Sequence, residues 1–81
     1  MMLTIMNNSD LHVRYEHKVK ILKYAYSIIQ VNERSNRVAL YLCSNDYERA
    51  LRYLNICKTA HSEWTDVSYY IINNNGESIA S

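Results

Sequence analysis

One stretch of the chain repeats apolar residues at the spacing of a helical face, and this feature constrains the fold most. Between residues 46 and 60, apolar side chains recur every three or four positions, and most of the intervening positions are polar. The stripe consists of Tyr47, Ala50, Leu51, Leu54 and Cys57, and His61 continues it. Ser44 or Asn45 can cap the first turn. We therefore predict one amphipathic helix, which must bury its apolar face against a second layer.

A hairpin is predicted after this helix. Residues 67–72 are rich in β-branched and aromatic side chains, which favour a strand. The Asn75-Gly76 pair follows, and Asn-Gly is the strongest short signal for a two-residue turn of type I′. Residues 77–80 supply the second strand of the hairpin.

A second hairpin is predicted before the helix. Strands at about 24–31 and 37–43 flank the polar stretch 32–36, which has the composition of a turn. The predicted order is therefore β-β-α-β-β. This order is typical of an α+β, two-layer domain with one main helix on a small antiparallel sheet. The length of 81 residues allows a single domain over 1–81.

Residues 11–23 fit two interpretations. Apolar and polar side chains alternate from Leu11 to Ile21, counting Tyr15 and His17 with the apolar set, and this favours a strand. The spacing of Leu11, Tyr15, Val19 and Leu22 also matches a helix. A strand that continued into the next one would be about 20 residues long, far beyond the usual range, so it needs a break near Lys23. We expect a strand here, with a helix as the alternative.

The sequence offers no set of residues to which catalysis can be assigned. Cys43 and Cys57 are interpreted as small buried hydrophobic residues. Cys57 and His61 form one pair four residues apart, whereas a structural zinc ion requires four ligands. The single glycine cannot build a phosphate-binding loop. We therefore expect a non-enzymatic protein with no catalytic residue, no metal and no cofactor.

A strip of basic and aromatic residues suggests an alternative function. Its basic members are Arg14, Lys18, Lys20 and Lys23. On a strand, the first three share one face, which can follow a phosphate backbone while tyrosines stack on bases. A second explanation is that lysines on an edge strand prevent unwanted pairing. The net charge is only +1, so composition does not itself favour nucleic acid. RNA or DNA binding is therefore kept as the alternative to binding of a protein.

The eight tyrosines are the most unusual part of the composition. If one helix covers one side of the sheet, the other side is free for a partner. Tyr41 is expected on the opposite face from Leu40 and Leu42, since side chains alternate along a strand. Aromatic and arginine side chains provide most of the binding energy at interfaces. The predicted partner-binding residues are Tyr24, Tyr26, Tyr41, Arg49, Arg52 and Trp64. Alternatively, the segment 11–23 or a second copy of the chain covers that face, and codon bias explains the tyrosines. For Trp64, a lid over the core is favoured over an exposed anchor.

In these respects the chain resembles the small accessory proteins of AT-rich phages. The likeness consists of the short length, the many Asn and Tyr residues and the β-β-α-β-β layout over 24–81, and it assigns no functional residue. It implies a protein that inhibits a host or defence complex by occupying its surface. The apolar start, residues 1–6, is too short for a signal-peptide core, and no run could span a bilayer. We expect a cytoplasmic protein with a protein partner and no membrane contact, and a homodimer is a further alternative.

Overall fold

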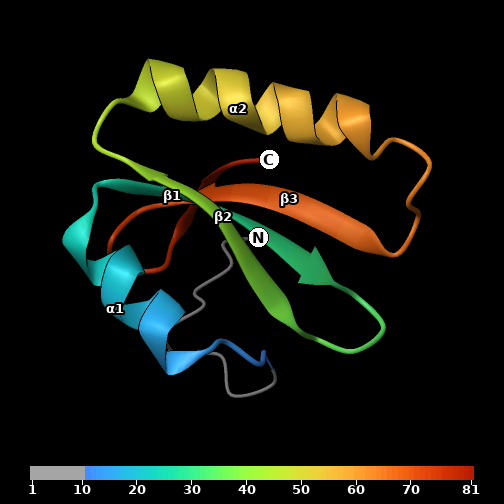
Figure 1. Cartoon of the computed structure of the whole chain (residues 1–81), viewed down its shortest axis with the longest axis horizontal. Coiled ribbons are helices and arrows are strands. Elements are labelled where there is room, and N and C mark those ends of the chain that lie inside the picture. Colours follow the sequence, from blue (N-terminus) through green and yellow to red (C-terminus); the bar gives the residue numbers. More distant parts are fainter. Residues whose placement is uncertain (1–10) are drawn as a thin grey trace.

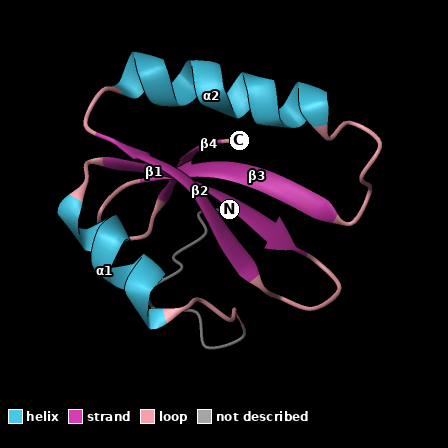
Figure 2. Ribbon diagram, in the orientation of Figure 1, coloured by secondary structure: helices cyan, strands magenta, loops and turns pink. Residues whose placement is uncertain are grey.

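The computed structural model describes residues 11–81, so the apolar start of the chain lies outside the described residues. The described part is an α+β fold with two helices and one four-stranded antiparallel sheet (Figures 1 and 2). The elements are α1 (Tyr15–Lys23), β1 (Tyr26–Asn32), β2 (Val38–Ser44), α2 (Tyr47–Ala60), β3 (Val67–Ile72) and β4 (Ser78–Ala80). The succession β1, β2, α2, β3 and β4 along the chain confirms the predicted β-β-α-β-β order. Across the sheet, the strands are arranged as β2-β1-β3-β4. Neither described helix is long and apolar enough to cross a membrane.

Residues 15–23 form a helix, so the expected strand is wrong and the helical alternative is confirmed. The helix ends at Lys23, and Tyr24 has extended backbone angles, which supplies the break that the length of the segment required. The buried residue of α1 is Ile21, whereas Tyr15 and Leu22 are 79% and 57% exposed. The apolar stripe that suggested a helix is therefore not the face that packs on the sheet.

Both faces of the sheet are covered. α2 lies across one face and α1 lies against the other (Figure 1). The cluster under α2 contains Ile28, Ala50, Leu54, Cys57, Tyr69 and Ile71. The cluster under α1 contains Ile21, Ile29, Val31, Val38 and Ile72, with Leu11 and Val13 packed against it. The expectation that one sheet face is free for a partner is therefore wrong, because α1 and the segment before it close that face.

The predicted stripe and the observed buried face of α2 coincide. Its fully buried residues are Ala50, Leu54 and Cys57, all members of that stripe. The cap is Asp46, whose carboxylate accepts hydrogen bonds from the N–H groups of Glu48 and Arg49 at 3.0 and 3.4 Å. The predicted caps have other roles. The Ser44 hydroxyl accepts a hydrogen bond from the Asp46 N–H, and the Asn45 side-chain oxygen accepts one from the Ala25 N–H.

A β-bulge in β2 changes the face that Tyr41 occupies. Ile28 of β1 pairs with Leu42, and Ile29 pairs with Leu40, so Tyr41 is the extra residue on β2. Tyr41 and Leu42 both pack on the α2 side, while Leu40 packs on the α1 side. The prediction that Tyr41 and Leu42 face opposite ways is therefore wrong. Strict alternation of side chains holds only where each residue has one partner on the neighbouring strand.

The turn between β3 and β4 differs from the predicted type I′ turn. Gly76 has a φ of 77°, but Asn75 is not among the residues with positive φ. The Gly76 N–H donates to the Asn73 carbonyl, and the Asn73 N–H donates to the Glu77 carbonyl, both at 3.0 Å. This is the three-residue loop in which a glycine in the left-handed region follows a type I turn. The single glycine of the chain therefore lies where a positive φ is required.

Candidate functional site

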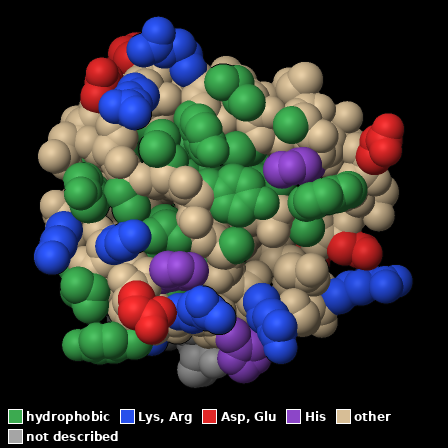
Figure 3. Space-filling view, viewed as in Figure 1, with side chains coloured by type: hydrophobic (Ala, Val, Ile, Leu, Met, Phe, Trp, Pro, Cys, Tyr) green, Lys and Arg blue, Asp and Glu red, His purple; other side chains and the backbone are tan. Residues whose placement is uncertain are grey.

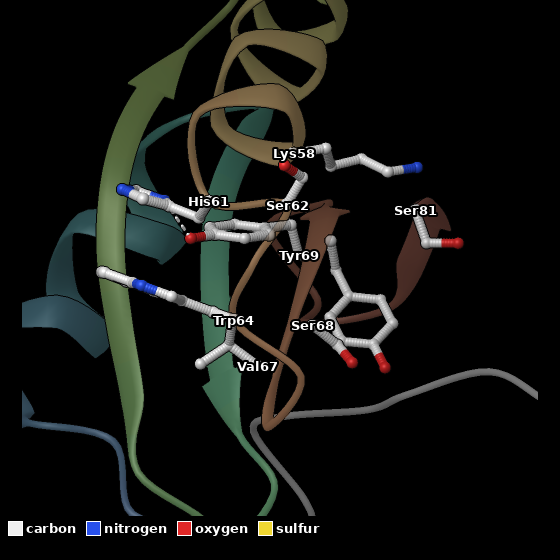
Figure 4. Close-up of a pocket in the computed structure, with 9 residues that line it drawn as sticks. Lys58, His61, Ser62, Trp64, Val67, Ser68, Tyr69 and Ser81 are labelled. Atoms are coloured by element: carbon white, nitrogen blue, oxygen red, sulfur yellow. Dashed lines mark hydrogen bonds between the residues drawn. The ribbon is translucent and has the colours of Figure 1, made fainter.

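An aromatic cluster lies at the C-terminal end of α2 (Figure 4). His61 ends the helix, and its backbone N–H donates to the Cys57 carbonyl at 3.1 Å. The imidazole stacks on the indole of Trp64, with ring centroids 4.1 Å apart and planes at 8°. Its Nδ1 is hydrogen bonded to the hydroxyl of Tyr69 on β3. Trp64 remains 53% exposed, so it forms an exposed surface rather than a lid over the core.

Gln30 of β1 connects this aromatic cluster to β2. Its side-chain Nε2 donates to the hydroxyl of Tyr41 at 3.0 Å and to the hydroxyl of Tyr69 at 2.8 Å. The Tyr41 ring meets the Tyr69 ring at 64°, with centroids 5.7 Å apart. One amide group thus satisfies two phenols, each of which would cost about 1–3 kcal/mol if left buried without a partner. The network holds the rings in one arrangement from β1 to the end of α2.

The pKa of Tyr41 is raised from 10 to about 12, chiefly by burial of the hydroxyl and then by the neighbouring Tyr69. A raised pKa means that the folded protein holds the proton more tightly than the unfolded chain. The resulting contribution to stability is fully present below about pH 10 and is lost as the pH rises towards 12.

Tyr41→Phe is therefore expected to remove one ionisation near pH 12 from a spectrophotometric titration of the folded protein, since no phenol remains there to lose a proton. The control is Tyr15→Phe, which removes a tyrosine that is 79% exposed and should leave that step in place. If the step near pH 12 persists in Tyr41→Phe, its assignment to the buried phenol is wrong.

A pocket of about 380 Å³ opens beside the aromatic cluster. It lies between the end of α2 and strand β3, and its lining includes Trp64, Val67 and Tyr69. Lys58 supplies the one charged side chain of the described lining, and Figure 4 shows it on the same side of the pocket as Ser81. The pocket combines aromatic surface with one cation, which suits a side chain of a partner. Among residues 11–81, no group of three or more His, Cys, Asp or Glu could hold a metal ion.

Cys57 and His61, considered above as a metal-binding pair, have different surroundings. Burial raises the pKa of the Cys57 thiol, which disfavours the thiolate that metal binding and nucleophilic catalysis require. The His61 Nδ1 is occupied by the Tyr69 hydroxyl. The pair therefore contributes to packing and to the position of the aromatic cluster.

The residues predicted to contact a partner do not form one patch. Tyr41 and Trp64 both border His61, at centroid distances of 6.3 and 4.1 Å. Tyr26 packs on Tyr47 instead, near the N-terminal end of α2, at a centroid distance of 5.3 Å. The structure therefore brings two of the predicted aromatic residues into the aromatic cluster and places a third elsewhere under the helix.

The other three predicted contact residues lie apart from the aromatic cluster. Tyr24 connects α1 to β1, is 38% exposed and lines a hollow beside β2. Arg49 and Arg52 are exposed on α2 and line none of the hollows described here. Neither arginine belongs to the buried stripe of the helix, and both side chains lie on its solvent-exposed side.

Because residues 15–23 are helical, the residues predicted to bind nucleic acid do not lie on one common face. Arg14 and Lys18 line one hollow beside β2, and Lys20 lines a second, while Lys23 lines neither. A helix completes a turn every 3.6 residues, so side chains that would share one face of a strand point in different directions. The expected basic face of a strand is therefore wrong. Three of the four residues nevertheless border the same strand, β2.

Several residues of these surfaces were not among the predicted site residues, and four of them take part in the argument. They are His17, Gln30, Arg37 and Tyr69, which line the hollows or belong to the aromatic cluster. Gln30 carries a recognisable signal, because it is one polar residue inside the apolar run 28–31. Arg37 has no such signal in the sequence, because only an isolated bridge between distant segments brings it beside His12.

β2 forms one edge of the sheet, and most of its outer side has no partner within residues 11–81. At its start, the Val38 N–H donates to the His12 carbonyl at 3.0 Å, so the backbone of Val38 points away from β1. Leu40, two residues further on and before the bulge, points its N–H and C=O the same way. The strand has no charged residue. Such an edge is a template for another extended chain.

Comparisons with protein-family models, with curated proteins and with solved structures found no match for this chain. Its function is therefore inferred from three features of its own geometry: the aromatic cluster, the hollows beside β2 and the open edge of that strand.

Proposed function

We propose that this chain is a small non-enzymatic binding protein that captures an extended segment of a partner protein along the edge of β2. The observation that carries the proposal is the outer side of β2, which beyond Val38 has no backbone partner among residues 11–81. β2 is an uncharged strand of seven residues at the end of the sheet. An extended peptide adds to such an edge through main-chain hydrogen bonds, and its side chains then determine specificity.

The surroundings of β2 support this proposal. Leu40 lies on the α1 side of the strand, while Tyr41 and Leu42 lie on the α2 side. An added strand alternates its side chains and therefore contacts both sides. Figure 3 shows hydrophobic side chains along the gap between α2 and β2. Tyr41, held by Gln30, provides apolar area and a fixed hydroxyl at this position.

The edge of β2 is also partly protected, which fits selective binding rather than aggregation. The bridge between His12 and Arg37 occupies the first position of the edge, and the bulge at Tyr41 twists the strand. A partner segment therefore has one short stretch available, from Ala39 to Ser44. A short edge with a bulge can pair with one complementary segment but resists edge-to-edge aggregation of many copies.

The composition that the chain shares with small accessory proteins of phages supports a partner among host or defence proteins, whose activity it blocks. Two free cysteines, Cys43 and Cys57, fit the reducing cytoplasm. Inhibition by occupation of a segment requires no catalytic group. The proposed protein is therefore non-enzymatic, binds a protein partner and acts in the cytoplasm.

Leu40→Pro is expected to reduce capture of the partner about tenfold, because proline removes the outward N–H and leaves a carbonyl of the partner without a donor. The measurement is quantitative mass spectrometry of proteins bound to the immobilised chain from a bacterial lysate. Proline is tolerated at the edge of a sheet, and circular dichroism verifies that the variant is folded.

The matched control is Leu40→Ala, which removes the same side chain but keeps the N–H. Proteins that wild type and Leu40→Ala recover, and that Leu40→Pro loses, would be partners bound through the strand edge. Equal recovery of the same proteins by Leu40→Pro and Leu40→Ala would show that the edge of β2 is not the binding site.

A further inference from the structure

Two hollows lie along β2 beside α1 and the segment before it, and they share one residue. The first is about 1030 Å³ and lies between the segment 11–14, the start of α1 and the beginning of β2. The second is about 250 Å³ and lies between α1 and residues 40–43. His17 lines both hollows, so they adjoin at this residue, and we call the two together the α1 groove. The α1 groove runs beside the open backbone of β2.

The charged side chains of the α1 groove all carry the same sign. They are Arg14, Lys18 and Arg37 in the first hollow and Lys20 in the second. No Asp or Glu of residues 11–81 lines either hollow, and none of the four cations forms an ion pair within that range. Figure 3 shows Lys, Arg and His side chains gathered on this part of the surface, with an acidic side chain beside them that lines neither hollow. The α1 groove therefore favours an anionic occupant.

His17 adds an independent indication of a ligand. Its Nδ1 is buried and has no hydrogen-bond partner in the described structure. A buried polar atom without a partner costs about 1–3 kcal/mol, and a ligand that hydrogen bonds to it removes this cost. His17 lies where the two hollows meet.

We propose that the segment captured along β2 is acidic and alternating, with Asp or Glu on the side that faces α1 and apolar residues on the side that faces α2. This inference rests on the proposed function. Side chains of an added strand point alternately to its two faces. One set enters the α1 groove, where Arg14 and Lys18 contact carboxylates. The other set meets Tyr41 and Leu42, which lie on the α2 side.

The same charges argue against other occupants of the edge. Two copies paired through β2 about a two-fold axis would place both α1 grooves on one face, where like charges repel. A nucleic acid would satisfy the cations. It has no main-chain pattern, however, to match the N–H and C=O groups of the strand edge.

The test is fluorescence anisotropy with a ten-residue peptide that alternates glutamate and valine. The matched probes replace each glutamate with glutamine, or place the same residues in two blocks. We expect the alternating acidic peptide to bind about tenfold more tightly than either matched probe, because carboxylates at every second position are needed to reach the groove. Its affinity is expected to fall as salt rises from 0.05 to 0.5 M.

Variants of the chain connect the binding to the groove. Lys18→Glu is expected to weaken binding of the alternating acidic peptide about tenfold, because it reverses a charge that lines the hollow. Arg49→Glu changes the net charge equally but lies on α2 outside the groove, so it is expected to change the affinity less than about twofold. Equal weakening by the two variants would show a general charge effect and overturn the inference.

Other outcomes identify what fails. Equal binding of the glutamate and glutamine peptides, both lost in Leu40→Pro, would overturn the acidic partner and leave the strand edge as a binding site. Binding of no peptide, together with equal capture by Leu40→Pro and Leu40→Ala, would overturn both proposals. Tighter binding of single-stranded oligothymidylate than of any peptide would assign the groove to nucleic acid. A solution dimer that Leu40→Pro dissociates would assign the edge to a second copy.

Discussion

Ile21→Ala is expected to lower the free energy of unfolding by about 2–5 kcal/mol. Ile21 is 0% exposed and is the buried residue of α1, where it joins Ile29 and Ile72 under the sheet. The truncation to alanine loses the free energy of burying the removed methyl and methylene groups, and it leaves a cavity that the short helix cannot fill by itself. Urea unfolding followed by circular dichroism measures the change as a shift of the midpoint.

The size of this effect tests whether α1 closes the second face of the sheet. A chain of this length has a total stability of about 4–12 kcal/mol, so the expected loss is a large part of it. The neighbouring Leu22→Ala is the control, because Leu22 is 57% exposed and its truncation should cost less than about 0.5 kcal/mol. Equal and small losses for the two variants would mean that α1 does not pack as described.

Leu54→Ala is expected to cause a loss of similar size, about 2–5 kcal/mol, on the opposite face of the sheet. Leu54 is 2% exposed and lies at the centre of the buried stripe of α2, against Ile28 and Ile71. Thermal or urea unfolding of the purified variant measures the change.

Ile56→Ala provides the comparison on the same helix. Ile56→Ala truncates an aliphatic side chain as Leu54→Ala does, but Ile56 is 60% exposed. Its loss is expected to change stability by less than about 0.5 kcal/mol, apart from a small gain in helix propensity. If Ile56→Ala were as destabilising as Leu54→Ala, the orientation assigned to α2 would be wrong.

These two helices matter to the binding proposals because each forms one side of the β2 edge. α2 supports Tyr41 and Leu42, and α1 supplies Lys18 and Lys20 of the α1 groove. A variant that loosens one helix should therefore change one side of the edge. The binding experiments above use surface substitutions at Lys18 and Arg49 for this reason, since they leave both apolar clusters intact.

The elements that the sequence predicted correctly are those whose pattern has a local cause. α2 was predicted within one residue because its buried residues repeat at the helical spacing. β3 was predicted at its observed limits because β-branched and aromatic residues are concentrated there. The helix α1 was wrongly predicted as a strand because residues 11–21 alternate between apolar and polar, while the apolar spacing over 11–22 also fits a helix. Local pattern alone could not choose between the two.

The candidate site was predicted in part for the same reason. Trp64 and Tyr41 could be named as aromatic residues near a helix end and on a strand, but their approach to His61 depends on the packing of α2 on the sheet. Arg37 could not be grouped with Arg14, since 23 positions separate them and only the fold brings both to one hollow. Contacts of this kind have no signature in the spacing of residues.

By itself, the sequence determined the amphipathic helix, the two hairpins and the α+β class, because periodicity, turn residues and strand composition act over a few neighbouring residues. Tertiary structure alone decided that residues 15–23 are helical, that a bulge turns Tyr41 towards α2 and that basic residues from two segments meet beside an open strand. The physical reason is that these outcomes depend on which apolar surfaces bury one another, and that choice is made by the whole chain.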